Sequence, residues 1–176
     1  MNAVDLLKQD HDTVRELLER LEKTTERGVK TREELLGKLH LELQVHTQLE
    51  EEIFYPAYTQ AGGKEEAVMA AEAKEEHRTV DSLVLPDLLN TDPGSIPFTG
   101  RLKVLKELIE HHIEEEEQEL FPQAKKLLDK ARLEQLGTAM QSRKGELQKT
   151  LSAQSASRPQ GAAGASRGAA SASSSD

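Results

Sequence analysis

The feature that most constrains this chain is an internal repeat of 66 residues. When the sequence is shifted by that distance, HTQLEEEIFYP, which starts at His46, falls on HIEEEEQELFP, which starts at His112. Apolar positions coincide as well, and in both copies they recur at steps of three and four, the spacing of one helix face. Two copies of one helical hairpin predict an all-α fold, an up-down four-helix bundle.

Five helical stretches are predicted, separated by turns that contain glycine or proline. The first runs from Asn2, an expected N-cap, to about Thr24, and the second opens with a capping box made by Thr31 and Glu34. Pro56 is expected to kink or end the second helix, because proline has no N–H to donate. The last three stretches are about 64–89, a helix after residue 100 that reaches a proline at 122, and about 129–151 beside or across the bundle.

The chain is predicted to contain one domain, residues 1–151, followed by a disordered tail, residues 152–176. The tail consists almost entirely of Ser, Ala and Gly and offers no apolar face to pack. With three Phe, two Tyr and no Trp, the core has to be filled by Leu, Val and Ala, as is usual in helical bundles.

Charge and composition narrow the possible functions. The formal net charge of −9 argues against a nucleic-acid partner, because a phosphate backbone requires a basic face. The absence of cysteine removes disulfides, thiolate zinc sites and iron–sulfur clusters, so any metal has to sit on nitrogen and oxygen ligands. No apolar run is long enough to span a membrane, and the start of the chain lacks the features of a signal peptide. We therefore expect a cytoplasmic protein without a membrane partner.

The repeat also predicts a layer of polar residues inside the bundle. Two histidines of each copy are 35 residues apart. The chain between them rises and returns by roughly 20 Å, at about 1.5 Å per residue, so the two imidazoles come level. The second histidine of each copy is followed four residues later by a glutamate, which lies on the same helix face. The layer consists of His11, His46, Glu50, His77, His112 and Glu116.

A layer of this kind predicts metal binding. One histidine on an apolar stripe is usually a hydrogen-bonded core residue, and one His-x-x-x-Glu carries no weight in a chain so rich in Glu. Four imidazoles and two carboxylates together are different, because a buried carboxylate costs several kcal/mol unless it is paired. Metal ions supply that compensation, and the donor set suits iron or manganese, with zinc as a possibility.

Two histidines have no histidine counterpart under the shift. His40 is expected at the surface, whereas His111 flanks the stripe and is either a partly exposed residue or a support for a ligand. The many glutamates around the layer should form a solvated acidic face. Among them, Glu51 and Glu117 are placed to accept hydrogen bonds from ligand histidines.

The motifs KQDHDTV, HTQLEEEIFYP, EEHRTV and HHIEEEEQELFP resemble the hemerythrin family, specifically its bacterial HHE cation-binding members. The resemblance extends from about Asp5 to Pro122 and, more loosely, through the fifth helix. It implies a non-haem diiron centre, two iron ions bridged by oxo or hydroxo, with the four layer histidines as terminal ligands. In such a centre Glu50 and Glu116 are the bridging carboxylates.

The chain departs from the family's respiratory oxygen carriers, which have five terminal histidines. Ala73 stands where a histidine would precede His77 by four residues, and the fourth helix offers Glu116 in place of a bridging Asp five residues after its histidine. The chain therefore resembles the four-His, two-Glu subgroup. Asp81, Tyr55 and Tyr58 are candidates to complete a coordination sphere, although ordinary surface or packing roles are expected for them.

Fewer terminal ligands leave open coordination positions, as metal sites that bind substrates require. This favours a protein that reacts with, or senses, peroxide, oxygen or nitric oxide over a reversible oxygen carrier. The alternative is a non-catalytic module that binds, stores or senses iron. A third possibility is a metal-free helical scaffold.

Overall fold

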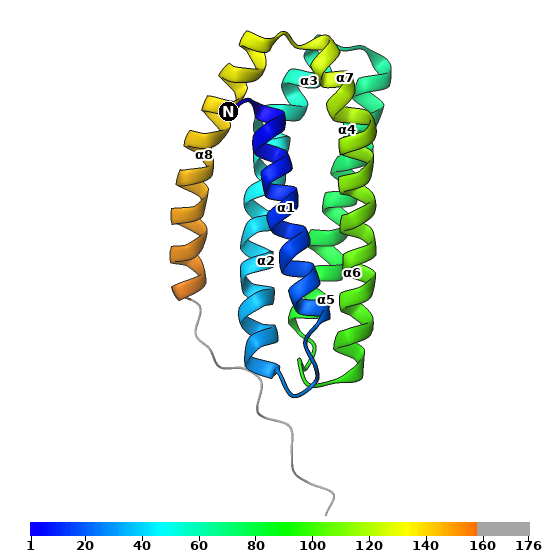
Figure 1. Ribbon diagram of the computed structural model, residues 1–176, viewed down its shortest axis with the longest axis vertical. Coiled ribbons are helices and arrows are strands. Elements are labelled where there is room, and N and C mark those ends of the chain that lie inside the picture. The colour runs from blue at the N-terminus through cyan, green and yellow to red at the C-terminus, as the bar shows by residue number, and fades with distance from the viewer. Residues whose placement is uncertain (158–176) are drawn as a thin grey trace, which may run out of the picture.

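The computed structural model describes residues 1–157, which form long helical runs joined by short turns (Figure 1). The all-α class is confirmed for these residues, and most of the predicted tail lies outside them. The runs are α1 (Ala3–Glu22), then α2 (Val29–Leu49) with η1 (Glu50–Phe54) and α3 (Tyr55–Ala61), then α4 (Lys64–Thr79) with η2 (Val80–Val84) and α5 (Leu85–Leu89), then α6 (Ile96–Glu115) with η3 (Glu116–Leu120) and α7 (Phe121–Leu127), and finally α8 (Lys130–Ser157).

The helices form a bundle in which α1 contacts α2 and α6, and α4 also contacts α6. The last helix, α8, packs on the outside of the bundle against α1 and α2 (Figure 1). It lies beside the bundle, as predicted, but continues six residues beyond the expected end at Leu151. Within residues 1–157, no helix is both long and apolar enough to cross a membrane.

The starts of the helices were predicted with mixed success. Asn2 is the N-cap of α1, as expected, and its side chain accepts a hydrogen bond from the backbone N–H of Asp5 at 3.1 Å. The predicted capping box of Thr31 and Glu34 is wrong, because α2 already begins after Gly28 and Thr31 lies in its first turn. The fourth run also starts earlier than predicted, at Ile96.

A buried arginine links the chain segments at the end of the bundle where α2 and α6 begin. Arg32 is almost completely buried, and its guanidinium donates to Thr24 Oγ1 at 2.8 Å and to the carbonyl of Pro93 at 2.6 Å. It also lies over the ring of Phe98, 5.0 Å from the ring centre. The Arg32 side chain therefore links the turn before α2 to the connection before α6. These contacts position the first turn of α2 without a capping box.

Prolines in the long helices are accommodated by π-helical turns. Pro56 does not end its helix, which continues to Ala61. A proline ring crowds the carbonyl four residues earlier, and the wider π turn relieves this, with the N–H of Tyr55 bonded to the carbonyl of Glu50 five residues before. The equivalent turn before the proline of the second copy is η3, and it begins at Glu116. Both predicted metal-binding glutamates thus open a π turn.

Two apolar clusters lie on either side of the predicted polar layer. One contains the start of α1, the region of η1 and α3, and the buried face of α8, including Leu7, Phe54 and Met140. The other fills the opposite half of the bundle and includes Leu39 and Phe98. Six of the leucine and isoleucine positions paired by the repeat are buried in it, namely Leu36, Leu39, Leu43, Leu102, Leu105 and Ile109.

Candidate metal centre

The six residues of the predicted layer come together between the two apolar clusters, and each is at most 8% exposed. Helices α1, α2, α4 and α6 each supply one histidine, and the two glutamates come from η1 and η3. The potential ligand atoms form two groups in which all members lie within 4.8 Å of one another. The first group is His11, His46, Glu50 and Glu116, and the second is Glu50, His77 and His112.

Glu50 is common to both groups. Its Oε1 lies 3.2 Å from His46 Nε2, and its Oε2 lies 3.4 Å from His77 Nε2. One oxygen of the carboxylate therefore faces each group, which is the arrangement of a carboxylate that bridges two cations.

Glu116 lies across the layer from Glu50. Its Oε2 is 3.1 Å from His11 Nε2 and 3.6 Å from His112 Nε2, so it also stands between histidines of different groups. The other oxygen, Oε1, accepts a hydrogen bond of 2.9 Å from the hydroxyl of Tyr55.

Unsatisfied polar atoms show that this donor set suits a metal. Among the described residues, the buried side-chain atoms without a hydrogen-bond partner are both oxygens of Glu50, both ring nitrogens of His46 and one oxygen of Asp10. Leaving such groups unpaired inside a protein is costly. Cations bound between the imidazoles and the carboxylates would offset the cost of burying these polar atoms. A set of neutral imidazoles and carboxylates suits iron, manganese or zinc.

The outward-facing nitrogens of two histidines are held by the glutamates that the sequence singled out. His11 Nδ1 lies 2.9 Å from Glu117 Oε1, and His77 Nδ1 lies 2.9 Å from Glu51 Oε1. Such contacts fix the orientation of a ring, so that the Nε2 atoms of these histidines face the centre of the layer.

The other two histidines are supported by carboxylates that sequence reasoning missed. His112 Nδ1 contacts Glu76 Oε2 at 2.7 Å, and His46 Nδ1 faces Asp10 Oδ2 at 3.7 Å. The repeat contained the signal, because Asp10 and Glu76 coincide under the 66-residue shift and each directly precedes a histidine of the layer.

The carboxylates of the layer favour the protonated form of the histidines that face them. Burial lowers the pKa of His77, but the carboxylates of Glu50 and Glu51, which face its two ring nitrogens, outweigh burial and raise the pKa to about 9. Burial also lowers the pKa of His46, whereas the charge of Glu50 and the contact with Asp10 raise it well above its ordinary value. Burial raises the pKa of Glu50, but the two histidines that it faces hold it well below the usual range. A cation therefore has to displace protons from these imidazoles.

Two aromatic rings border the layer at equivalent positions of the repeat. Phe121 stacks on His11 with ring centres 5.5 Å apart, and Tyr55 stacks on His77 at 5.9 Å. The hydroxyl of Tyr55 also donates a hydrogen bond to Glu116. Tyr58 does not contact the layer in this way, because its hydroxyl donates to the side chain of Gln123. Burial, followed by the charge of Glu116, raises the pKa of Tyr55 well above its ordinary value.

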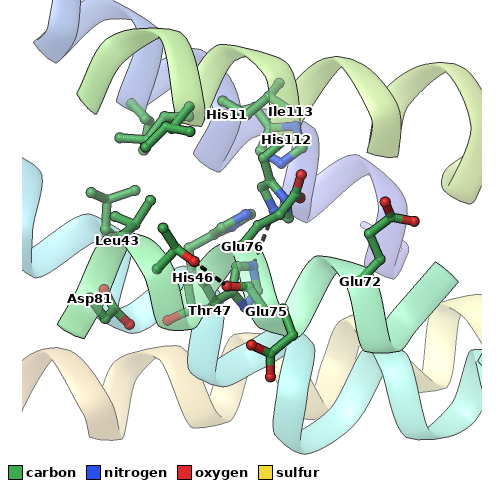
Figure 2. Close-up of a pocket in the computed structure, with 16 residues that line it drawn as sticks. His11, Leu43, His46, Thr47, Glu72, Glu75, Glu76, Asp81, His112 and Ile113 are labelled. Carbon is green, nitrogen blue, oxygen red and sulfur yellow. Dashed lines mark hydrogen bonds and ion pairs between the residues drawn. The ribbon is translucent and has the colours of Figure 1, made fainter. Parts of the chain in front are cut away.

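A cavity of about 250 Å³ reaches the histidines of all four helices (Figure 2). Its walls are largely apolar, and carboxylates, among them Asp81, Glu75 and Glu76, also line it. A second cavity, of about 510 Å³, lies between α4 and α6 with η3, and Ala73 lines it together with His112 and Glu116. The small side chain of Ala73 therefore borders open space next to the layer.

The remaining histidines lie outside both groups, and His111 belongs to a third, largely exposed group with Glu76 and Glu115. His40 is half-buried rather than at the surface. The side chain of His111 is 62% exposed and lies 3.3 Å from Glu115 and 3.8 Å from Glu76. The repeat therefore separates His112, which lies in the layer, from its neighbour His111, which does not.

Residues 2–124 match the family model of the hemerythrin HHE cation-binding domain, and the chain belongs to this family. An uncharacterized Mycobacterium tuberculosis protein, Rv2633c, is 31% identical over 147 residues, which cover 81% of this chain and 85% of that protein. The crystal structure of a hemerythrin HHE cation-binding-domain protein from Mycobacterium kansasii, a homologue of Rv2633c, superposes with a TM-score of 0.79 at 26% identity and covers 90% of this chain and 94% of its own. A DNA nickase from Nostoc is 24% identical over 154 residues, and the match spans only 42% of that protein.

Proposed function

We propose that this protein is a cytoplasmic, non-haem diiron protein that reacts with or senses peroxide, oxygen or nitric oxide. The ligands in this proposal are His11, His46, Glu50, His77, His112 and Glu116. The observation that carries it is the position of Glu50, whose two unpartnered oxygens face a histidine of each group at 3.2 and 3.4 Å. The two repeated hairpins would form an up-down bundle, with each hairpin giving two histidines and one glutamate.

In this proposal the carboxylates and imidazoles have separate tasks. Glu50 and Glu116 would hold the cations from opposite sides of the layer, and the four histidines, whose Nε2 atoms face the layer, would complete the set of ligands. Glu117, Glu51 and Glu76 keep three of the rings oriented through hydrogen bonds at 2.7–2.9 Å. Two bound iron ions would supply electrons to a small oxidant or bind a diatomic ligand.

The size and position of the smaller cavity are consistent with a small ligand at the layer. The cavity of about 250 Å³ ends at the histidines and is lined by apolar side chains such as Val14, Leu43 and Ile113. Apolar side chains beside the histidines suit oxygen and nitric oxide, and these ligands and peroxide require little recognition by the protein.

Metal analysis of aerobically purified protein, combined with its absorption spectrum, tests the proposal. We expect two iron ions per chain and near-ultraviolet charge-transfer bands that change when peroxide, azide or nitric oxide is added. His112→Ala should lose iron, and His111→Ala is the matched control, because its exposed side chain lies one residue away and belongs only to a separate, largely exposed group with Glu76 and Glu115. A colourless protein with two zinc ions would contradict the proposal.

The second candidate is a non-catalytic iron-binding, storage or sensing module. Six ligands in a buried layer suit stable binding of iron as well as turnover. Two iron ions per chain with peroxide consumption no faster than that of free iron would identify this module. The proposal leaves out nucleic acid, because the chain carries a net charge of −9 and spans only 42% of the Nostoc nickase.

A further inference from the structure

We propose that α8 is a working part of the metal centre, because its Lys144 holds the carboxylate that orients His46. This inference rests on the proposed function, in which His46 is a metal ligand. Helix α8 starts at Lys130 and therefore lies beyond residues 2–124, the part of the chain that matches the family. Lys144 would be a positioning residue, which acts on the ligand through Asp10.

A chain of contacts leads from α8 to the layer. Lys144 Nζ donates a hydrogen bond to Asp10 Oδ1, and Asp10 Oδ2 faces His46 Nδ1 at 3.7 Å. On the far side of the ring, His46 Nε2 faces Glu50. The side chains of Asp10 and Lys144 are only 5% and 18% exposed, so solvent screens their attraction much less than at the surface.

The other half of the repeat provides an internal comparison. Glu76, the counterpart of Asp10, reaches His112 Nδ1 directly at 2.7 Å. Aspartate is one methylene shorter than glutamate, and Asp10 stops 3.7 Å from His46. Asp10 therefore takes its hydrogen bond from Lys144 and not from the ring, whereas Glu76 reaches its histidine directly.

Helix α8 is fixed on both sides of Lys144. Arg143 forks onto the carboxylate of Glu52 with contacts of 2.8 and 3.1 Å. Gly137 allows the helix to approach the start of the chain so closely that a Cβ there would lie 2.5 Å from the carbonyl oxygen of Met1. The apolar face of α8 joins the neighbouring apolar cluster through Leu133, Leu136, Met140 and Leu147.

These contacts couple two equilibria. If the docked helix orients His46 for a cation, a cation bound at His46 must stabilise the docked helix by the same factor, because coupling between two binding events is reciprocal. Loss of the Lys144 charge should weaken cation binding at the group that contains His46. The group formed by Glu50, His77 and His112 should be affected less.

The first test is an anaerobic titration of metal-free protein with Fe²⁺ in competition with a chromophoric chelator. In Lys144→Met, which keeps the apolar stem, we expect one of two iron sites to bind about 10-fold more weakly, the low end for loss of a residue that supports a ligand. Lys144→Arg should restore most of the affinity. Lys149→Met is the matched control, and it should stay within about twofold of the unmodified protein, because Lys149 is an exposed lysine of the same helix.

Hydrogen exchange of the unmodified protein provides the second test and does not depend on how a variant folds. Adding Fe²⁺ should increase the protection of the amides of α8, and Asp10→Asn should abolish this increase. The inference is overturned if α8 exchanges equally with and without iron, or if folded Lys144→Met binds both ions with unchanged affinity. An unmodified protein that binds no iron would instead overturn the proposed function, and this inference with it.

Discussion

At the scale of single residues, the centre is defined by carboxylates that are buried among imidazoles. Glu50 is fully buried, and neither of its oxygens has a hydrogen-bond partner among the described residues. Such a group is tolerated only where charge compensates it. Its two oxygens and the imidazoles that face them therefore form one functional unit.

Replacing Glu50 with glutamine tests this unit. Glu50→Gln keeps the shape of the side chain but removes the charge and one acceptor oxygen, so the metal content should fall from two ions per chain to one or none. Glu52→Gln is the control, because Glu52 lies in the same π turn and pairs with Arg143 at the surface. Elemental analysis of both purified variants measures the difference. A Glu50→Gln protein that retains two ions would exclude a bridging role.

The protonation of His77 predicts how the stability of the metal-free protein depends on pH. Its pKa is about 9 in the folded protein and about 6.5 in an unfolded chain, so the proton stabilises the fold fully below pH 6.5. This contribution is lost as pH rises through 9. Thermal melts of the metal-free protein should therefore show a falling Tm between pH 6.5 and 9. The metal-loaded protein should show a weaker dependence, because the cation has replaced the proton; a flat or rising Tm in the metal-free form would contradict this account.

The sequence predicted the six residues that the structure brings together, because the repeat compared each candidate with its counterpart. It did not predict Asp10 and Glu76, since an acidic residue beside a histidine is common in a chain with 32 acidic residues. Only the packing of α1 against α2 and of α4 against α6 turns these side chains towards His46 and His112.

At the scale of elements, helix types and positions were predictable, whereas the local devices that end or bend a helix were not. Apolar periodicity located every long run. The start of α2 depends on Arg32, whose partners are distant in sequence, at Thr24, Pro93 and Thr99. The π turns were not predicted, because a proline in a helical sequence usually indicates a kink or an end. Nothing in the sequence pattern indicates that a π turn relieves the clash between the proline ring and the carbonyl four residues earlier.

Two glycines of α8 make opposite predictions for the same substitution. At Gly137 an added Cβ would lie 2.5–2.8 Å from backbone atoms of residues 1–3, so Gly137→Ala should destabilise the protein by about 1–3 kcal/mol. At Gly145 no atom lies within 4 Å of an added Cβ. Gly145→Ala should therefore stabilise the protein by up to about 1 kcal/mol through helix propensity. Thermal denaturation of the two variants measures both effects, and a Gly137→Ala protein as stable as Gly145→Ala would refute the close contact.

At the scale of the whole molecule, the bundle surrounds a polar layer that bound cations would stabilise. Ligands that bind only the folded state stabilise it by about 2.7 kcal/mol at a hundredfold excess over Kd. For a chain of this size, removing the metal should lower the Tm by roughly 5–10 °C. Melting curves before and after treatment with a strong chelator measure the change, and readdition of Fe²⁺ should restore the original Tm. An unchanged Tm would favour the metal-free scaffold.

The two apolar clusters on either side of the layer have a consequence for how the molecule unfolds. Each cluster buries its own set of apolar side chains. When no cation is present, the unpaired polar groups between the clusters weaken the packing that joins the two ends of the bundle. The end that contains α8 can then open while the other end stays closed. Cations shared between residues from α1, α2, α4 and α6 would join the two ends. The same chain should therefore unfold as one cooperative unit with metal and in two steps without it.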